Sequence, residues 1–416
     1  MRTLPLPAAV LVAAAAVLAC GAGCKTKSAP DDPFESGPYV QSATSKSLVV
    51  AQVTRAPSRL HVDFEPVGRP DARRSAEEPA ATRVHGITLE GLEPDTAYAY
   101  QVRDAATGQP LGGSTFRTAP LPGSAARAVK IVAVGDTGGT GRRDTYSKIE
   151  DLTRRVIRGG GGHGHTQGVV AAAIGAEDPD LILHTGDVVY PEGGRGSYAE
   201  AFFRPFARVI DHIPLFPVLG NHDVKTEDGA PYLDVFHLPE NSPAPERYYS
   251  FDYGPVHVVA LDTNTSDFDP GSDQERWLAD DLALASQAGR PPWKIAVWHQ
   301  PPFSDGEHGD NVLAQQSVLP ILERYSVDLV ICGHDHDYQR FYSVRGVSYV
   351  VTGGGGKSLY DVTPTPRLAY YASLDHFVRL SVSPHRLDLE AVTPAGAVFD
   401  SFTLEKAPPV ETEDAR

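Results

Sequence analysis

From residue 130 onward the chain is organised around short, continuous apolar runs that are rich in β-branched residues. Runs of this kind predict strands that are buried on both faces. They lie at residues 130–134, 181–183, 215–219, 256–261, 294–298, 329–332 and 347–352. Helix-like stretches separate several of them, at residues 145–158, 169–174, 275–285 and 315–325. This alternation predicts an α/β (βαβ) sandwich over residues 128–404, with strands packed between layers of helices.

Five of these runs lead directly into side chains that are good metal ligands. Because ligands bind at the carboxyl ends of the strands in open α/β sheets, we expect these side chains to converge. A glycine before several of them lets the backbone turn sharply and approach an ion closely. One Gly-Asp pair after a strand is usually only a turn, but five such endings in one chain predict a metal site. The candidate ligands are Asp136, Asp187, Tyr190, Asn221, His299, His334 and His336.

Residues 36–119 follow a different pattern, with short alternating strands between turns. Examples lie at residues 47–54, 59–64 and 97–103. Residues 91–100 enter a strand through a Pro-Asp turn and place a tyrosine at its start, as in the tyrosine corner of immunoglobulin-like sandwiches. The pattern predicts a fibronectin type III-like β-sandwich, joined to the second domain by a linker that contains proline and glycine.

The first residues predict a leader rather than a part of the fold. Arg2 precedes an apolar run from residue 4 to 19, which fits the core of a secretory signal over residues 1–24. Cys20 and Cys24 each end a segment similar to a bacterial lipoprotein processing box, so either lipidation or plain cleavage would follow. Residues 25–35 form the expected tether. The protein is therefore expected to be exported, as a periplasmic, membrane-anchored or extracellular protein.

Three further segments are expected to carry no chemistry. Cys332, which lies in an apolar run, is expected to be a buried small side chain rather than a nucleophile. The glycine-rich loop at 159–168 contains His163 and His165, but its glycines cannot hold metal ligands in place. Residues 405–416 are rich in Pro and Glu and predict a disordered tail.

The charge of the chain limits its partners. A formal net charge of −16 argues against a nucleic-acid-binding surface and against docking on anionic membranes through a basic face. Contact with a membrane is expected only through a lipid anchor. An acidic protein that handles anionic substrates must concentrate positive charge in its site, and bound metal cations do this.

The ordered motifs carry a resemblance to a known family. The set Gly-Asp, Gly-Asp-x-x-Tyr, Gly-Asn-His-Asp, a His after an apolar strand, and Gly-His-x-His resembles the calcineurin-like metallophosphoesterases. Tyr190, three residues after Asp187, is similar to the purple acid phosphatase branch. The predicted sandwich in front resembles the amino-terminal domain of that branch. The chain departs from the family in the long gap between Asp136 and Asp187, and at Asp223 and Ala296, none of which removes a ligand.

The resemblance implies two metal ions and a role for each ligand. Asp136, Tyr190 and His336 would bind the first metal, usually ferric iron in the family, and Asp187 would bridge both. Asn221, His299 and His334 would bind a second metal, which may be zinc, iron or manganese. The chemistry agrees, because a strongly Lewis-acidic ion is needed to hold a tyrosine deprotonated, and imidazole and amide ligands suit a softer divalent ion.

Three side chains beside the ligands are expected to serve catalysis. His222 is a candidate for phosphate contact or proton delivery, and Asp223 is placed next to it to orient it. His308, nine residues after His299, resembles in position a substrate-side histidine of the family, although a surface loop histidine is the alternative. We expect His184 to be a packed core residue, and Tyr338 and Arg340 to be structural support.

The expected function is that of a metal-dependent, acid phosphatase-like hydrolase. A hydroxide held by the two metals would attack phosphate monoesters of small molecules and release inorganic phosphate. Two alternatives stay open. The same metal site could act on phosphodiesters, such as nucleotides or lipid head groups, or the chain could be an inactive surface-binding lipoprotein. The last would usually require a lost ligand, and all seven are present.

Overall fold

A computed structural model describes residues 35–124, 126–138 and 166–407 of the chain. The strands predicted from residue 130 onward form two β-sheets in it. Predictions for the leader, the helix-like stretch at 145–158, and most of the tether, of the glycine-rich loop and of the tail lie outside the described residues. His163 and His165 are among the residues not described.

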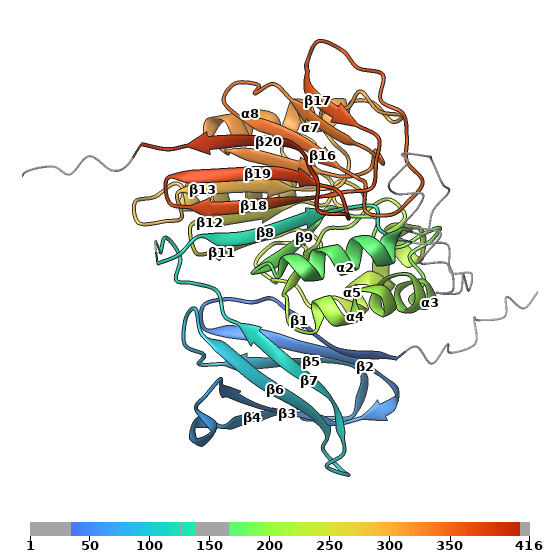
Figure 1. The fold of residues 1–416 in the computed structure, drawn as a ribbon, viewed down its shortest axis with the longest axis vertical. Helices are drawn as coiled ribbons and strands as arrows, with labels where there is room; N and C mark the ends of the chain where they lie inside the picture. Colours follow the sequence, from blue (N-terminus) through green and yellow to red (C-terminus); the bar gives the residue numbers. More distant parts are fainter. Residues whose placement is uncertain (1–34, 125, 139–165, 408–416) are drawn as a thin grey trace, which may run out of the picture. The chain divides into compact units, whose positions relative to one another are not determined.

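The first sheet has six strands in the order β10-β9-β8-β18-β19-β20. β8, β9 and β10 run parallel to one another, and β18 pairs with β8 antiparallel (Figure 1). The parallel part is buried, as predicted, and the antiparallel part comes from the end of the chain. The strands are β8 (Val129–Val134), β9 (Leu181–His184), β10 (Leu215–Pro217), β18 (Phe377–Ser383), β19 (Arg386–Val392) and β20 (Val398–Glu405).

The second sheet has seven strands in the order β11-β12-β13-β14-β16-β15-β17. Neighbours from β12 to β16 are parallel in this order, and β11, β15 and β17 pair antiparallel at the two sides. The strands are β11 (Tyr249–Tyr253), β12 (Val256–Ala260), β13 (Trp293–Val297), β14 (Leu329–Cys332), β15 (Tyr338–Phe341), β16 (Ser348–Thr352) and β17 (Leu368–Ala372).

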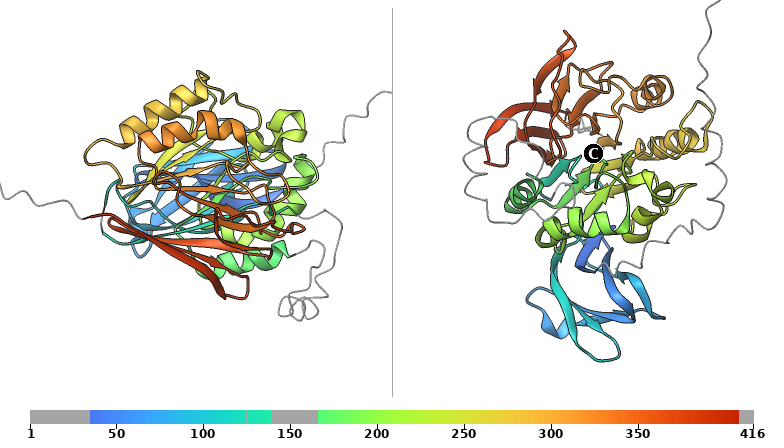
Figure 2. Two further views of the ribbon diagram at one scale, coloured as in Figure 1. Left: turned by 90° about the horizontal axis from the view of Figure 1, so that it is seen from above. Right: turned by 90° about the vertical axis from the view of Figure 1, so that its right-hand side faces the viewer.

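Successive residues of the second sheet enter two different hydrophobic cores. Ile295 and Val297 of β13 pack in a core shared with the first sheet, whereas Ala296 packs in a second core with residues of helix α6 (Asp273–Ala285). Such strands are buried on both faces, which explains their continuous apolar sequences. Cys332 is buried in the second core, as expected. Figure 2 shows the yellow and orange helices that form this outer layer together on one side of the sheets.

The helices depart from prediction at one point. The helix expected at 315–325 is two helices, α7 (Val312–Ser317) and α8 (Leu319–Arg324). Pro320 lies in the first turn of α8, and a proline has no N–H with which to continue the preceding helix. The other helical segments are α2 (Gln167–Glu177), α3 (Arg195–Tyr198), α4 (Arg204–Ile210), α5 (Ala230–Val235), and the short turns η1 (Pro70–Ala72), η3 (Ala199–Phe203), η4 (Asp223–Lys225) and η5 (Glu227–Gly229).

The amino-terminal strands form two antiparallel sheets of their own, β1-β2-β5 and β4-β3-β6-β7. Alternate residues of β6 are buried, and Tyr98 near its start accepts a hydrogen bond from Glu93 N at 2.9 Å. This contact pins the turn that precedes β6, as expected of a corner tyrosine. The strands are β1 (Ser36–Gln41), β2 (Ser47–Ser58), β3 (Leu60–Pro66), β4 (Arg74–Glu77), β5 (Thr82–Glu90), β6 (Ala97–Asp104) and β7 (Pro110–Arg117).

The two sets of sheets share no strand, but hydrogen bonds join them within the unit that begins at Pro33. Tyr39 Oη donates to Val235 O at 2.5 Å, and Tyr100 Oη donates to Asp211 O at 2.7 Å. The domain boundaries at residues 119 and 128 stay predictions. In the part of the chain that the structure describes, no helix is both long enough and apolar enough to cross a lipid bilayer.

Candidate metal centre

The predicted ligands follow β8, β9, β10, β13 and β14, and hydrogen bonds tie the loops after these strands to one another. His334 N donates to Asp136 Oδ2 at 3.0 Å, and His222 N donates to Asp187 Oδ1 at 2.7 Å. Asp136, Asp187 and His334 have left-handed φ values of 59°, 49° and 72°. Non-glycine residues rarely adopt this conformation, and it persists where the surrounding structure enforces it, often at functional sites.

Two glycines make this convergence possible. A Cβ at Gly333 would lie 2.6 Å from Asp136 Oδ2, and a Cβ at Gly220 would collide with the backbone nitrogen of Asp187. Any larger residue would push the loops apart. The glycines before the ligands therefore serve close packing of one ligand loop against another, which sharpens the role expected from the sequence.

Three of the predicted ligands form a first subsite. The Tyr190 hydroxyl lies 2.9 Å from Asp136 Oδ1 and 2.9 Å from His336 Nε2. His336 Nδ1 donates to Ser358 O at 2.7 Å, which leaves Nε2 free to act as a ligand. All three side chains are buried, with at most 3% of any one exposed.

Three others form a second subsite. His299 Nε2 lies 3.0 Å from Asn221 Oδ1 and 3.2 Å from His334 Nδ1. His299 Nδ1 donates to Thr185 O at 2.9 Å, so Nε2 is again the free nitrogen. His299 is buried, whereas Asn221 and His334 are partly exposed. The second subsite is thus the one that opens toward solvent.

Asp187 lies between the two subsites. Its Oδ1 is 3.5 Å from His299 Nε2, and the ligand atoms of Asp136, Asp187 and His299 all lie within 4.8 Å of one another. The side chain is only 1% exposed. Burial would raise the pKa of Asp187, but the charges and hydrogen bonds of His299 and His222 together outweigh burial and hold that pKa below its ordinary value. Asp187 is therefore an anion placed to contact both subsites.

The donor set fits cations. In the first subsite the single hydroxyl hydrogen of Tyr190 cannot serve both Asp136 Oδ1 and His336 Nε2. In the second subsite, His299 Nε2 faces Asn221 Oδ1. Because Nδ1 carries the hydrogen of the neutral ring, both atoms are acceptors unless His299 is protonated. Burial would lower the pKa of His299, but the charge and hydrogen bond of Asp187, with the charge of Asp136 and the hydrogen bond to Thr185, raise it to about 9, so the carboxylates around this ring favour a positive charge. Metal ions would supply that charge through the same atoms.

Two of the three expected catalytic side chains lie beside these ligands. The His222 ring packs on Tyr190 with ring centroids 4.3 Å apart, and its Nε2 lies 3.9 Å from Asp187 Oδ2. The His308 ring packs on His334 with centroids 4.0 Å apart. His308 donates from N and Nδ1 to Asp335 Oδ1, at 3.0 and 2.8 Å, and this contact raises the pKa of His308. The structure thus places His308 beside the second subsite.

Asp223 has a different role from the one expected. Its carboxylate accepts hydrogen bonds from Val188 N, Gly220 N and the Tyr198 hydroxyl at 3.2, 2.9 and 2.8 Å, with no contact to the His222 side chain among the described residues. Adjacent residues of a turn point apart, so Asp223 cannot orient His222. It is fully buried and instead ties together the loops that carry Asp187 and Asn221.

His184, Tyr338 and Arg340, which were expected to be structural, contact residues outside the ligand set. His184 is fully buried in β9, where its Nε2 lies 2.9 Å from Thr137 Oγ1. Burial lowers the pKa of His184 to about 3. Tyr338 and Arg340 both bind Asp400 of β20, at 2.8 Å and 2.6 Å, and so join β15 of the second sheet to β20 of the first.

Sequence reasoning missed four residues around the centre. Asp335 holds His308, as described above. The Tyr360 ring stacks on His336 with centroids 4.1 Å apart. Lys225 and Lys357 lie against His222 and Tyr190. The signals were present but weak, since Asp335 separates two ligand histidines and Lys357 follows a run of four glycines.

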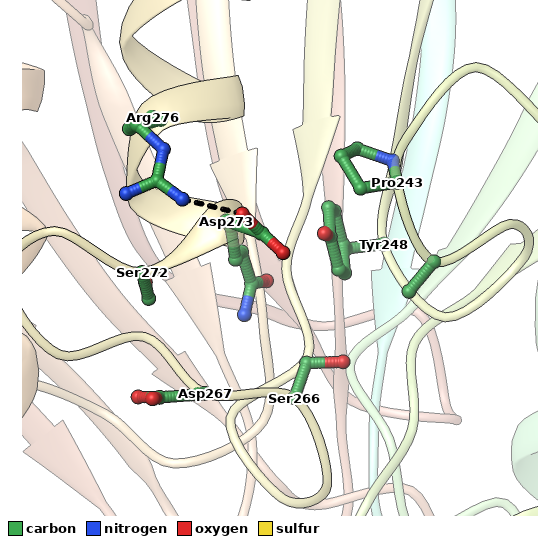
Figure 3. Close-up of a pocket in the computed structure, with 9 residues that line it drawn as sticks. Pro243, Tyr248, Ser266, Asp267, Ser272, Asp273 and Arg276 are labelled. Carbon is green, nitrogen blue, oxygen red and sulfur yellow. Dashed lines mark hydrogen bonds and ion pairs between the residues drawn. The ribbon is translucent and has the colours of Figure 1, made fainter.

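A surface hollow lies away from these residues, at the amino-terminal end of α6. It has a volume of about 420 Å³, and its walls include Tyr248, Ser266 and an ion pair of Arg276 with Asp273 at 2.5 Å (Figure 3). None of the predicted ligands or catalytic residues lines it. It is therefore separate from the candidate metal centre.

Comparison with known proteins agrees with the fold. The calcineurin-like phosphoesterase family matches residues 129–338, which is half of the chain, and the chain belongs to this family. It stands on the purple acid phosphatase-like branch. Purple acid phosphatase 23 of Arabidopsis thaliana is 27% identical over 311 residues, covering 66% of this chain and 62% of that protein.

One further relative and one solved structure match a larger share of the chain. A protein of Arabidopsis thaliana named probable inactive purple acid phosphatase 27 is 24% identical over 366 residues, covering 77% of this chain and 57% of that protein. A purple acid phosphatase from yellow lupin (Lupinus luteus) seeds has the same fold, with a TM-score of 0.76, 20% identity, and coverage of 88% of this chain and 74% of that one. The chain spans about half to three fifths of the length of the curated relatives it matches.

Proposed function

We propose that this protein is an acid phosphatase-like hydrolase that releases phosphate from small phosphate monoesters with the help of two bound metals. One observation carries the proposal. Six of the seven predicted ligands form two subsites on either side of the seventh, Asp187, and the second subsite opens toward solvent through Asn221 and His334. Such a pair of neighbouring cation sites suits a phosphate group, which can bridge two metals.

The residues divide by the metal that each subsite suits. Asp136, Tyr190 and His336 would hold iron, because a phenolate is a hard anionic ligand. Asn221, His299 and His334 would hold zinc, iron or manganese, and Asp187 would contact both ions. Two cations bound there would neutralise the phosphate and activate a water molecule for attack on phosphorus.

The chain's own residues would position the substrate and supply protons. Asp335 holds His308 by its Nδ1, at 2.8 Å, which leaves Nε2 free to face a leaving group. His222 Nδ1 donates to Pro191 O at 2.7 Å, and this contact fixes its ring beside Tyr190. Both histidines are partly exposed, as groups that meet a substrate must be.

We further propose that residues 36–119 form a fibronectin type III-like domain and that residues 1–24 are a leader for export, with or without lipidation at Cys20 or Cys24. The two antiparallel sheets and the contact of Tyr98 with Glu93 support the first part. The proposal of a leader is based on the apolar run after Arg2. Expression of the full chain, followed by fractionation and mass spectrometry of its first peptide, tests the second part.

The test of function combines metal analysis with two substrates. Purified protein should contain about two metals per chain, including iron, and should be violet if Tyr190 binds ferric iron. It should hydrolyse p-nitrophenyl phosphate faster than bis-p-nitrophenyl phosphate. A colourless protein with two zinc or manganese ions would keep the hydrolase and refute the iron subsite. Preference for the diester would establish the phosphodiesterase alternative, and a metal-free protein without activity would refute the proposal.

A further inference from the structure

Two lysines lie beside the metal centre without being part of its ligand set. Lys357 Nζ lies 4.3 Å from the centre of the Tyr190 ring. Lys225 Nζ donates to the His222 ring, 3.1 Å from Nε2. Because Tyr190 and His222 pack on each other with ring centroids 4.3 Å apart, each ammonium group lies against one ring of the same pair.

Neither ammonium group has a carboxylate partner within 4.0 Å among the described residues. Many other cations of the described part form such pairs, for example Arg127 with Asp180 at 2.6 Å and Arg340 with Asp400 at 2.6 Å. In a chain with a net charge of −16, carboxylates are plentiful. Two lysines beside one site that both lack a carboxylate partner therefore need an explanation other than surface charge balance.

The position of the lysines separates them from the reacting phosphate. Lys357 lies over the ring of Tyr190 rather than among the ligand atoms, and its backbone N donates to Asp136 O at 3.2 Å, which fixes the start of the side chain. Lys225 is exposed and Lys357 partly exposed. Both can therefore meet a group that projects from the metal centre toward solvent.

We propose that Lys225 and Lys357 bind a second phosphate group of the substrate, next to the phosphate that is cleaved. This inference rests on the proposed function. The site would then favour small molecules with two phosphates close together, such as diphosphates or neighbouring bisphosphates, over simple monoesters. An ammonium–phosphate contact is a charge-assisted hydrogen bond, which is among the stronger polar interactions.

The test compares substrates that differ in one phosphate. Wild-type protein, Lys225→Met and Lys357→Met are assayed with p-nitrophenyl phosphate and with inorganic pyrophosphate. Each variant should lose about tenfold in kcat/KM for pyrophosphate, mainly through KM, and stay within about twofold for p-nitrophenyl phosphate. Lys225→Arg should retain most of the preference. Lys46→Met, which changes an exposed lysine of the amino-terminal sandwich, is the matched control.

Binding without turnover provides a second measurement. Calorimetric titration with methylenediphosphonate and with methylphosphonate should show about tenfold weaker binding of the diphosphonate by each lysine variant and unchanged binding of the monophosphonate. Equal losses for both ligands would overturn the proposal, because the lysines would then act on the reacting phosphate. No loss would also overturn it. A wild-type protein that hydrolyses neither p-nitrophenyl phosphate nor pyrophosphate, yet keeps the diphosphonate preference, would refute the hydrolase function alone.

Discussion

At the scale of single residues, Asp187 is the side chain on which both subsites depend. It is almost fully buried, has a left-handed backbone, and lies near ligand atoms of both subsites. His222, by contrast, is partly exposed and contacts Asp187 mainly through its backbone nitrogen. The two residues are neighbours in space, but the roles proposed for them are separable, one for holding metal and one for meeting the substrate.

Asp187→Ala should therefore lose both metals and all activity, because no other carboxylate among the described residues lies between the subsites. His222→Ala should keep the metals and lose about 10²–10⁴-fold in kcat. Elemental analysis of both purified variants, together with their kinetics, checks the pair. Full metal content in Asp187→Ala would refute the bridging role, and metal loss in His222→Ala would make that histidine a ligand.

At the scale of elements, a buried charge network joins β11, β12 and α6. His257 of β12 lies 2.7 Å from Asp252 of β11 and 2.8 Å from Asp281 of α6. The network lies outside the metal centre and fastens a helix to two strands. Burial would lower the pKa of His257, but its hydrogen bonds to Asp252 and Asp281 raise it to about 9.

This network should make stability depend on pH. The pKa of His257 in the folded state, about 9, lies above its ordinary value of 6.5, so its contribution is complete below about pH 6.5 and is lost as the pH rises through 9. His257→Gln should lower the free energy of unfolding by about 3 kcal/mol at pH 6 and by much less above pH 9. Urea denaturation at both pH values measures this. As a control, His385→Gln, which changes an exposed histidine, should leave the free energy of unfolding unchanged at both pH values. If His257→Gln lowered that free energy equally at both pH values, the charge of His257 would be excluded as the cause.

The elements also show where local patterns suffice. The strand at 329–332 was predicted to the residue, because a strand buried on both faces has an unbroken apolar sequence. The division between α7 and α8 was missed, although Pro320 marks it, because the apolar spacing continues across the break. Asp223 was misassigned for a different reason. Its partners, Val188 and Tyr198, are distant in sequence, and no local pattern specifies them.

At the scale of the whole molecule, the metal centre lies where two sheets meet, and its loops come from both. Asp136, Asp187 and Asn221 follow strands of the first sheet, and His299, His334 and His336 follow strands of the second. Metals bound there would join the two sheets. Without them, the buried carboxylates of Asp136 and Asp187 lie close together with less compensating charge.

Removal of the metals should therefore destabilise the whole protein. Chelation is expected to lower Tm by about 5 °C or more, since tight binding to the folded state alone adds several kcal/mol to stability. Differential scanning calorimetry of the protein before and after chelation measures the shift, and added metal should restore it. Asp187→Ala should show no shift with the same chelator. An unchanged Tm after complete loss of metal would show that the sheets are joined without it.

The sequence by itself determined where the buried strands lie along the chain and which seven side chains are the candidate ligands, because both are local: apolar runs specify strands, and the candidate ligands follow them directly. The tertiary structure alone decided which atoms face one another. It placed His336 Nε2 beside Tyr190, directed Asp223 into the backbone of a neighbouring loop, and brought Lys225 and Lys357 to the same pair of rings. Apart from the contact of Lys225 with His222, these contacts join residues far apart in the chain. They depend on how two sheets pack, which no short stretch of sequence specifies.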